Sequence, residues 1–187
     1  MGLTTWLAAS VFLCAGLATA ETPDVLIRTS FGAIPIVLDR SETPAAADKL
    51  LDLARRKHSG VWNRAEPRPS TPGDPSGPYG LLQGAFDHDQ MNLPKAGTKR
   101  HIRPGDIVLI PETNAFYLSL ADHDDWATGH TVIGRATHLT IADVITVQET
   151  REYIHPEYGT RMQMLSSPVP FVLTDDVTDL AMMLSPS

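Results

Sequence analysis

Apolar and polar residues alternate, or β-branched residues cluster, in a series of short runs along most of the chain. A period of two is typical of β-strands that bury one face, and Gly, Pro, Asn, Asp and Ser between the runs indicate turns. The expected strands lie at residues 24–29, 34–39, 61–64, 81–86, 106–110, 115–120, 131–136 and 169–174. The pattern therefore predicts about seven or eight short strands joined by loops.

One segment has the period of an α-helix. Four of its apolar residues are spaced i, i+3, i+4 and i+7, namely Ala47, Leu50, Leu51 and Ala54. Thr43 is the expected N-cap, Pro44 suits the first helical position, and Gly60 is the expected stop. Because the apolar stripe is narrow, this helix should pack on a sheet.

A second helix is expected to begin with a cap at Thr140–Asp143 and to have Ile141, Val144 and Ile145 on one apolar face. Strands and helices do not alternate along the chain as they do in parallel sheets. The pattern therefore predicts an all-β fold, a closed antiparallel barrel with two capping helices.

The first twenty residues differ in composition from the rest. An apolar stretch from Trp6 to Leu17 is followed by Ala18-Thr19-Ala20, the small-x-small pattern that a signal peptidase accepts. We expect residues 1–20 to be a secretory signal and residues 21–187 to be one domain, secreted or lumenal in the secretory pathway. No Lys or Arg precedes the apolar stretch, which leaves an uncleaved N-terminal anchor as the alternative.

The charge balance excludes two classes of partner. The net charge is −7, and no charged side chain lies in the first twenty residues. An acidic surface repels phosphate backbones and anionic lipids, so neither nucleic acid nor, after signal cleavage, a membrane is expected as a partner. The single cysteine, Cys14, leaves with the signal, so the mature domain should depend on packing for its stability.

The order of several short motifs resembles the cyclophilin family of peptidyl-prolyl isomerases. In chain order the motifs are T-x-x-G from Thr29, T-P-A-A-A from Thr43, the arginine Arg64, L-Q-G around Gln83, F-Y-L-S-L from Phe116, Trp126, and G-H-T-V-I-G-R from Gly129. Each motif is weak alone, and their order and spacing carry the resemblance. It implies a closed antiparallel eight-stranded β-barrel and catalysis of cis-trans isomerisation at X-Pro bonds.

The resemblance implies two catalytic and five substrate-binding residues. Arg64 matches the catalytic arginine of the family, and Gln83 matches the glutamine that helps to hold it and binds the substrate backbone. The implied substrate-binding residues are Tyr117 at the pocket floor, Trp126 and His130 at its rim, Leu81 as an apolar wall, and Ile110 in the substrate clamp. Tyr79 is the alternative to Leu81 for the wall.

Strand geometry supports part of this assignment. Alternation places Phe116 and Leu118 on one face of their strand and Tyr117 on the other, so the two sets cannot be buried equally. The structural alternative is that Tyr117 and Trp126 are ordinary half-buried aromatic residues and His130 is a strand-edge histidine.

The implied reaction needs an arginine. Rotation about an X-Pro amide has a barrier of about 18–20 kcal/mol, because the nitrogen lone pair is delocalised into the carbonyl group. In the twisted transition state the lone pair returns to nitrogen, where an Arg64 N–H can donate to it. This chemistry requires no metal, cofactor or covalent nucleophile.

Several positions depart from the family pattern. Asn63 stands where the family has a histidine, and a Pro-rich segment at residues 66–80 follows Arg64. Pro111 has no N–H to offer a substrate, and Ala127 replaces a leucine. We therefore expect a weakened isomerase acting on secretory-pathway or extracellular clients. The alternative is a non-catalytic module that binds proline-containing segments as a chaperone or scaffold.

The expected partners are proline-containing peptides or protein clients. The resemblance adds cyclosporin-like ligands, and we expect a monomer. Two acidic segments, Asp87–Asp89 and Asp122–Asp125, each contain a histidine beside carboxylates, which is a pattern of hard-metal ligands. We favour solvated acidic loops over a metal site at both places.

Overall fold

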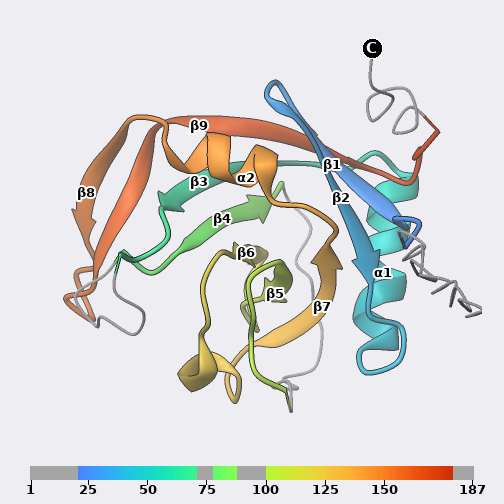
Figure 1. Cartoon of the computed structure of the whole chain (residues 1–187), viewed down its shortest axis with the longest axis horizontal. Helices are drawn as coiled ribbons and strands as arrows, with labels where there is room; N and C mark the ends of the chain where they lie inside the picture. Colours follow the sequence, from blue (N-terminus) through green and yellow to red (C-terminus); the bar gives the residue numbers. More distant parts are fainter. Residues whose placement is uncertain (1–20, 71–77, 88–99, 179–187) are drawn as a thin grey trace, which may run out of the picture.

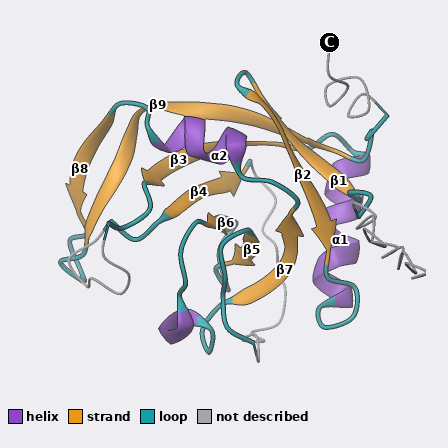
Figure 2. Ribbon diagram, in the orientation of Figure 1, coloured by secondary structure: helices purple, strands orange, loops and turns teal. Residues whose placement is uncertain are grey.

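Nine strands, two α-helices and a short 3-10 helix make up the part of the chain that the computed structural model describes, residues 21–70, 78–87 and 100–178 (Figure 1, Figure 2). In chain order they are β1 (Val25–Thr29), β2 (Gly32–Leu38), α1 (Pro44–Arg55), β3 (Ser59–Glu66), β4 (Leu81–Phe86), β5 (Asp106–Leu109), β6 (Ala115–Ser119), η1 (Asp124–Trp126), β7 (Thr131–Ala136), α2 (Thr140–Thr146), β8 (Thr150–Ile154) and β9 (Arg161–Thr174). Within these ranges no helix is long and apolar enough to cross a membrane. The expected secretory signal, residues 1–20, lies outside them.

The sheet closes on itself. The described strands follow the order β1-β2-β7-β5-β6-β4-β3-β9 with antiparallel pairings. The circle is completed where β1 pairs with the last part of β9, from Leu26 opposite Thr174 to Thr29 opposite Phe171. β8 pairs with the first part of β9 and lies outside the circle (Figure 1). The prediction of a closed antiparallel eight-stranded barrel is confirmed, with one strand added.

Helix α1 packs on the barrel as its narrow apolar stripe predicts, and it begins as expected, with Thr43 at the N-cap position and Pro44 as its first residue. Its side-chain cap and its C-terminal end differ from the expectation. The hydroxyl of Thr43 donates to the carbonyl oxygens of Asp39 and Val132, and it caps no N–H of the helix. The helix ends before Lys57, which takes a left-handed φ of 51°. Gly60 is therefore not the stop. It belongs to β3, where a Cβ would lie 2.4 Å from a carbonyl oxygen of the neighbouring strand and from a core ring.

Helix α2 also begins without the expected cap. Thr140 is its first residue, and no side chain of the preceding turn accepts from its N–H groups. Its buried residues are Ala142, Ile145 and Thr146, whereas Val144 is exposed. The expected apolar face is thus wrong at Val144, because the helix is short and only one side of it reaches the sheet.

The sequence pattern does not predict β8 or the first part of β9. Four of the five residues of β8 are exposed, so this strand has no buried face and no alternation of apolar and polar residues. In β9 the pattern predicts only residues 169–174, although the strand begins at Arg161. Periodicity identifies a strand only where one of its faces enters a core.

Aromatic side chains fill the interior of the barrel. The ring of Phe116 on β6 lies 5.0 Å from the Trp62 ring, 4.7 Å from the Phe86 ring and 5.7 Å from the Phe171 ring, measured between centroids. These four residues come from four strands, β6, β3, β4 and β9, and all are buried. The interior is therefore a packed core in which the rings of four consecutive strands of the barrel meet.

A β-bulge at Asn63 determines which side chains of β3 face outward. The register of β3 shifts between Trp62 and Arg64 against both of its neighbours, β4 and β9. Trp62 and Ala65 both belong to the interior core, although strict alternation would place residues three apart on opposite faces. The extra residue reverses the alternation, so Arg64 and Glu66 lie on the outer face of the barrel.

Candidate active site

Cross-strand pairing places three of the predicted site residues in one row on the outer face of the barrel. Arg64 of β3 is opposite Gln83 of β4, and Gln83 is opposite Tyr117 of β6. The row continues through Val108 of β5 to Val132 of β7. Side chains directly opposite each other on one face have Cβ atoms about 4.5–5.5 Å apart. The two predicted catalytic residues and the predicted pocket floor are therefore neighbours.

A second apolar cluster, here called the outer cluster, covers this row and is separate from the interior core. Its buried members are Leu81, Ile102, Val108, Tyr117 and Val132, and the residues packed at its margin are Tyr79, Ile110, Trp126 and Ala127. Four of the five predicted substrate-binding residues belong to it. The structure thus brings together positions that are spread over about fifty residues of the sequence.

Trp126 ends the 3-10 helix η1 and is packed among other rings. The ring of His123 stacks on it, with the centroids 4.1 Å apart and the planes 2° apart. The rings of Tyr117 and Tyr79 lie 5.8 Å and 5.7 Å from it. From the sequence, His123 is indicated only as part of the metal-ligand pattern at Asp122–Asp125, where a solvated loop is favoured; the structure instead buries its side chain. The signal available was its spacing, since side chains at i and i+3 of a 3-10 helix eclipse one another.

His130, the other predicted rim residue, is hydrogen-bonded to the predicted floor residue. Its Nδ1 lies 3.1 Å from the hydroxyl oxygen of Tyr117. Burial raises the pKa of the Tyr117 phenol, and the charge of Asp106 adds to this effect. Burial lowers the pKa of His130. Both groups are therefore neutral near pH 7, and the pair brings no charge into the outer cluster.

Arg64 is buried and held from two sides. Its Nε and Nη2 each lie 2.7 Å from Oε1 of Glu66, and its Nη1 donates to Oε1 of Gln83 at 3.2 Å. The guanidinium carbon lies 5.4 Å from the centroid of the Tyr79 ring, a cation–π distance. The side chain of Arg64 is 9% exposed and that of Glu66 is 2% exposed. Glu66 is not among the residues predicted for the site, because it stands at the start of the Pro-rich segment, where a loop is expected; it is the last residue of β3.

The outer cluster is closed in this conformation. Tyr117 is only 1% exposed. The ring of Tyr79 lies near both the Arg64 guanidinium and Trp126, so it covers the space between the predicted catalytic and rim residues. A proline ring could touch Tyr117 only after a covering ring had moved. The function of Tyr117 as a pocket floor stays a prediction.

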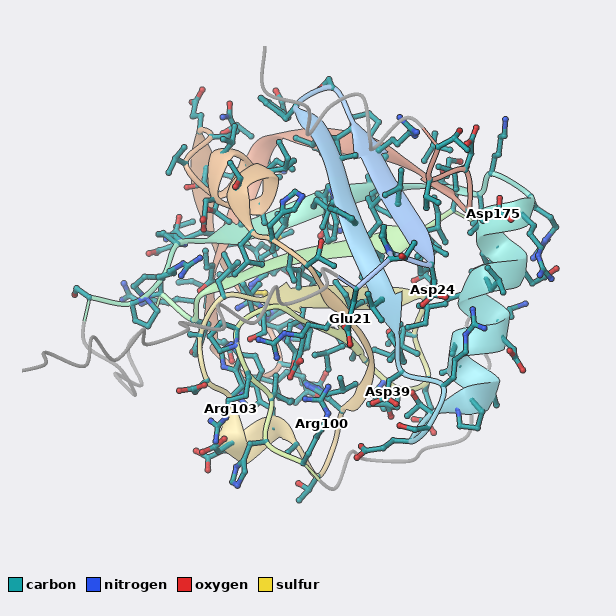
Figure 3. All side chains as sticks on the ribbon, turned by 45° about the vertical axis from the view of Figure 1, so that its right-hand side comes forward. Glu21, Asp24, Asp39, Arg100, Arg103 and Asp175 are labelled. Atoms are coloured by element: carbon teal, nitrogen blue, oxygen red, sulfur yellow. The ribbon has the colours of Figure 1, made fainter. Side chains whose placement is uncertain are left out.

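The acidic segment before Trp126 is paired with an arginine and a histidine. Arg103, which Figure 3 shows beside the 3-10 helix, lies 3.1 Å from Asp122 and 3.0 Å from Asp124, and His101 lies 2.8 Å from Asp124. Of the other acidic segment only Asp87 is within the described residues, where it accepts from the Ser59 hydroxyl. No group of three metal-ligating side chains occurs among the residues that the structure describes.

Two histidines that pack against the outer cluster, His123 and His130, predict a loss of stability at mildly acidic pH. Burial is the largest cause that lowers the pKa of His123, and burial lowers the pKa of His130. The unfolded chain binds these protons near pH 6.5, and the folded protein binds them only at lower pH. Their stabilising contribution is therefore complete above pH 6.5 and decreases as the pH falls below it. We expect a lower Tm at pH 5.5 than at pH 7.5.

The control for this prediction is the His123→Gln variant. It removes one of the two groups, so its Tm should change less between the two pH values than that of the wild-type protein. A wild-type Tm that is the same at pH 5.5 and pH 7.5 would contradict the prediction.

The barrel with its two helices is cyclophilin-like in architecture. No protein-family model matches the sequence, and no curated protein matches it. Similar solved structures include two crystal structures of a cyclophilin type peptidyl-prolyl cis-trans isomerase from Cryptosporidium parvum, one of them determined in the presence of the dipeptide Ala-Pro. Both have a TM-score of 0.46 and 12% sequence identity, and the match covers 78% of this chain and 96% and 95% of theirs. These structural neighbours are cyclophilin-type isomerases.

Proposed function

We propose that residues 21–187 form a peptidyl-prolyl cis-trans isomerase that acts on X-Pro bonds of proteins in the secretory pathway or outside the cell. The observation that carries the proposal is the placement of Arg64, a buried guanidinium held by Glu66 and Gln83 beside the outer cluster. The proposed location is supported by the signal-peptide pattern of residues 1–20.

Arg64 would act through those of its N–H groups that are not bonded to Glu66 or Gln83. A guanidinium has five N–H donors. Three are used by Glu66 and Gln83, which leaves one on each Nη. When the X-Pro bond is twisted, the prolyl nitrogen regains its lone pair and can accept one of them. The planar substrate has no such acceptor, so the bond stabilises the transition state more than the ground state.

Gln83 would hold both the arginine and the substrate. Its Oε1 accepts from Arg64, while its NH2 group makes no hydrogen bond to other described residues. That group is a donor for a substrate carbonyl. The apolar side chains of the outer cluster would surround the proline ring and exclude water, which strengthens the hydrogen bond from Arg64.

The turn after β5 supports the proposal that isomerisation is weak. The N–H of Ile110 donates to the carbonyl oxygen of Ala115, and Pro111 has no N–H. Neither residue offers a backbone donor to a substrate strand. The closed outer cluster adds the cost of moving a ring. Both features affect the binding of substrate and leave the chemistry of Arg64 intact. The proposed ligands are proline-containing peptides, with cyclosporin-like molecules as candidate competitors, and we propose that the protein is a monomer.

The test is a direct assay of X-Pro isomerisation by NMR exchange, with residues 21–187 and the Arg64→Ala variant side by side. We expect the wild-type protein to accelerate the reaction and the variant to lose about 100- to 1000-fold of kcat/KM. Because the variant leaves Glu66 buried without its ion partner, its fold must be checked by circular dichroism. Equal rates for two folded proteins would contradict the proposal. Binding without acceleration would favour the non-catalytic module.

A further inference from the structure

Glu66 is a buried carboxylate whose contacts are all donors. Its Oε1 accepts from Nε and Nη2 of Arg64 and, at 3.4 Å, from the backbone N–H of Gln163. Its Oε2 accepts from the backbone N–H of Tyr79 at 2.7 Å. An ionised carboxylate only accepts hydrogen bonds, so this set of partners suits the charged form. A charged side chain that is almost completely buried requires such partners.

The partners of Glu66 come from three separate parts of the chain. Arg64 is on β3, Gln163 is on β9, and Tyr79 precedes β4. Arg64 and Glu66 are two residues apart and so share one face of β3, and the bulge at Asn63 makes this the outer face. One carboxylate therefore holds the guanidinium and also anchors the backbone of the residue whose ring lies 5.4 Å from that guanidinium.

We propose that Glu66 is a positioning residue of the isomerase site. The inference rests on the proposed function and concerns how Arg64 is aimed. Glu66 takes the Nε–Nη2 edge of the guanidinium, and Gln83 takes one N–H of Nη1. The plane of the guanidinium is then fixed, and the remaining N–H groups keep one direction. Without Glu66, the long side chain of Arg64 has many rotamers, of which few place an N–H at a prolyl nitrogen.

The charge of Glu66 makes this inference testable. Glu66 lies 2.7 Å from the guanidinium and lowers the positive potential that a substrate meets. If net positive charge near the prolyl nitrogen were what matters, the Glu66→Gln substitution would raise the rate. If orientation matters, the same substitution lowers the rate, because the NH2 group of the introduced amide would face a donor, either the guanidinium or the N–H of Tyr79. The two interpretations therefore predict opposite signs.

The experiment compares wild-type protein, Glu66→Gln, Arg64→Ala and the double variant in the NMR exchange assay with a proline-containing peptide. We expect Glu66→Gln to lower kcat about tenfold or more, while the peptide Kd stays within about threefold of the wild-type value. In the Arg64→Ala background, Glu66→Gln should have no further effect on the rate. The Nε–H resonance of Arg64 should be protected from exchange in the wild-type protein and lose this protection in Glu66→Gln.

The matched control is Asp24→Asn. Asp24 also accepts from a backbone N–H, that of Leu38 at 2.8 Å, and from an arginine, Arg40 at 2.7 Å, and it lies near α1 (Figure 3). This variant should keep the wild-type rate. If Glu66→Gln does not fold, Glu66→Asp replaces it in the experiment. This variant keeps the negative charge, but its side chain is shorter by one methylene group, so the carboxylate lies farther from Arg64.

The outcomes separate this inference from the proposed function. A folded Glu66 variant with a wild-type or higher rate overturns the positioning function while Arg64→Ala is still inactive. An equal loss from the Glu66 substitution in both backgrounds overturns it as well, since the effect then does not act through Arg64. If Arg64→Ala is as active as the wild-type protein, the proposed function itself fails.

Discussion

Arg64→Lys should isomerise X-Pro bonds about 100-fold more slowly than the wild-type protein, although it keeps a positive charge at this position. The guanidinium reaches Glu66 with two nitrogens and Gln83 with the third, and it still has N–H groups for a substrate. An ammonium has three donors at a single nitrogen and cannot hold both partners in one plane. Directed hydrogen bonding would therefore be lost while the charge remains. The measurement is kcat/KM in the NMR exchange assay.

The control for this prediction is Arg68→Lys. Arg68 also donates to a carboxylate, that of Asp143, but both side chains are about half exposed and neither belongs to the outer cluster. Its rate should equal that of the wild-type protein. If Arg64→Lys retained full activity, charge alone would be sufficient, and the geometry of the Arg64–Glu66 pair would be irrelevant to catalysis.

Phe116→Ala should lower the free energy of unfolding by about 3–5 kcal/mol. The Phe116 ring is 1% exposed and packs against Trp62, Phe86 and Phe171 inside the barrel. Removal of the ring leaves a cavity among the three remaining rings, which paired strands cannot close by small movements. For a domain whose total stability is on the order of 5–15 kcal/mol, the expected loss is large. The measurement is equilibrium unfolding in urea, with the midpoint and the m-value both recorded.

The matched control is Phe31→Ala. Phe31 lies in the turn between β1 and β2 and is 37% exposed. The same chemical change there should cost less than about 1 kcal/mol, because the ring is outside the core and already contacts water. A Phe116→Ala protein within about 1 kcal/mol of the wild-type value would show that the aromatic rings do not form a tightly packed interior.

The sequence predicts those site residues that lie on regular strands or within the family-like motifs. Alternation separates Tyr117 from Phe116, and the structure indeed places Tyr117 in the outer cluster and Phe116 in the interior core. The motif order singles out Arg64 and Gln83, which are cross-strand neighbours. His123 could not be found in this way, because it stands in an acidic run just before the 3-10 helix and belongs to no strand, and its partner is the ring of Trp126 at the end of that helix.

The sequence by itself determined the eight strands of the barrel and helix α1, because each of these elements buries at least one face and so has either a regular apolar period or a run of β-branched and apolar residues. Tertiary structure alone decided the direction of Arg64. Strict alternation from Trp62 would have placed Arg64 inside the barrel, and the bulge at Asn63 turns it outward. A bulge forms where a strand pairs with its neighbours, here β4 and β9, and β9 is about a hundred residues distant in the chain. The residues around Asn63 alone do not indicate the pairing of β3 with β9, and so they do not indicate that Glu66 is buried.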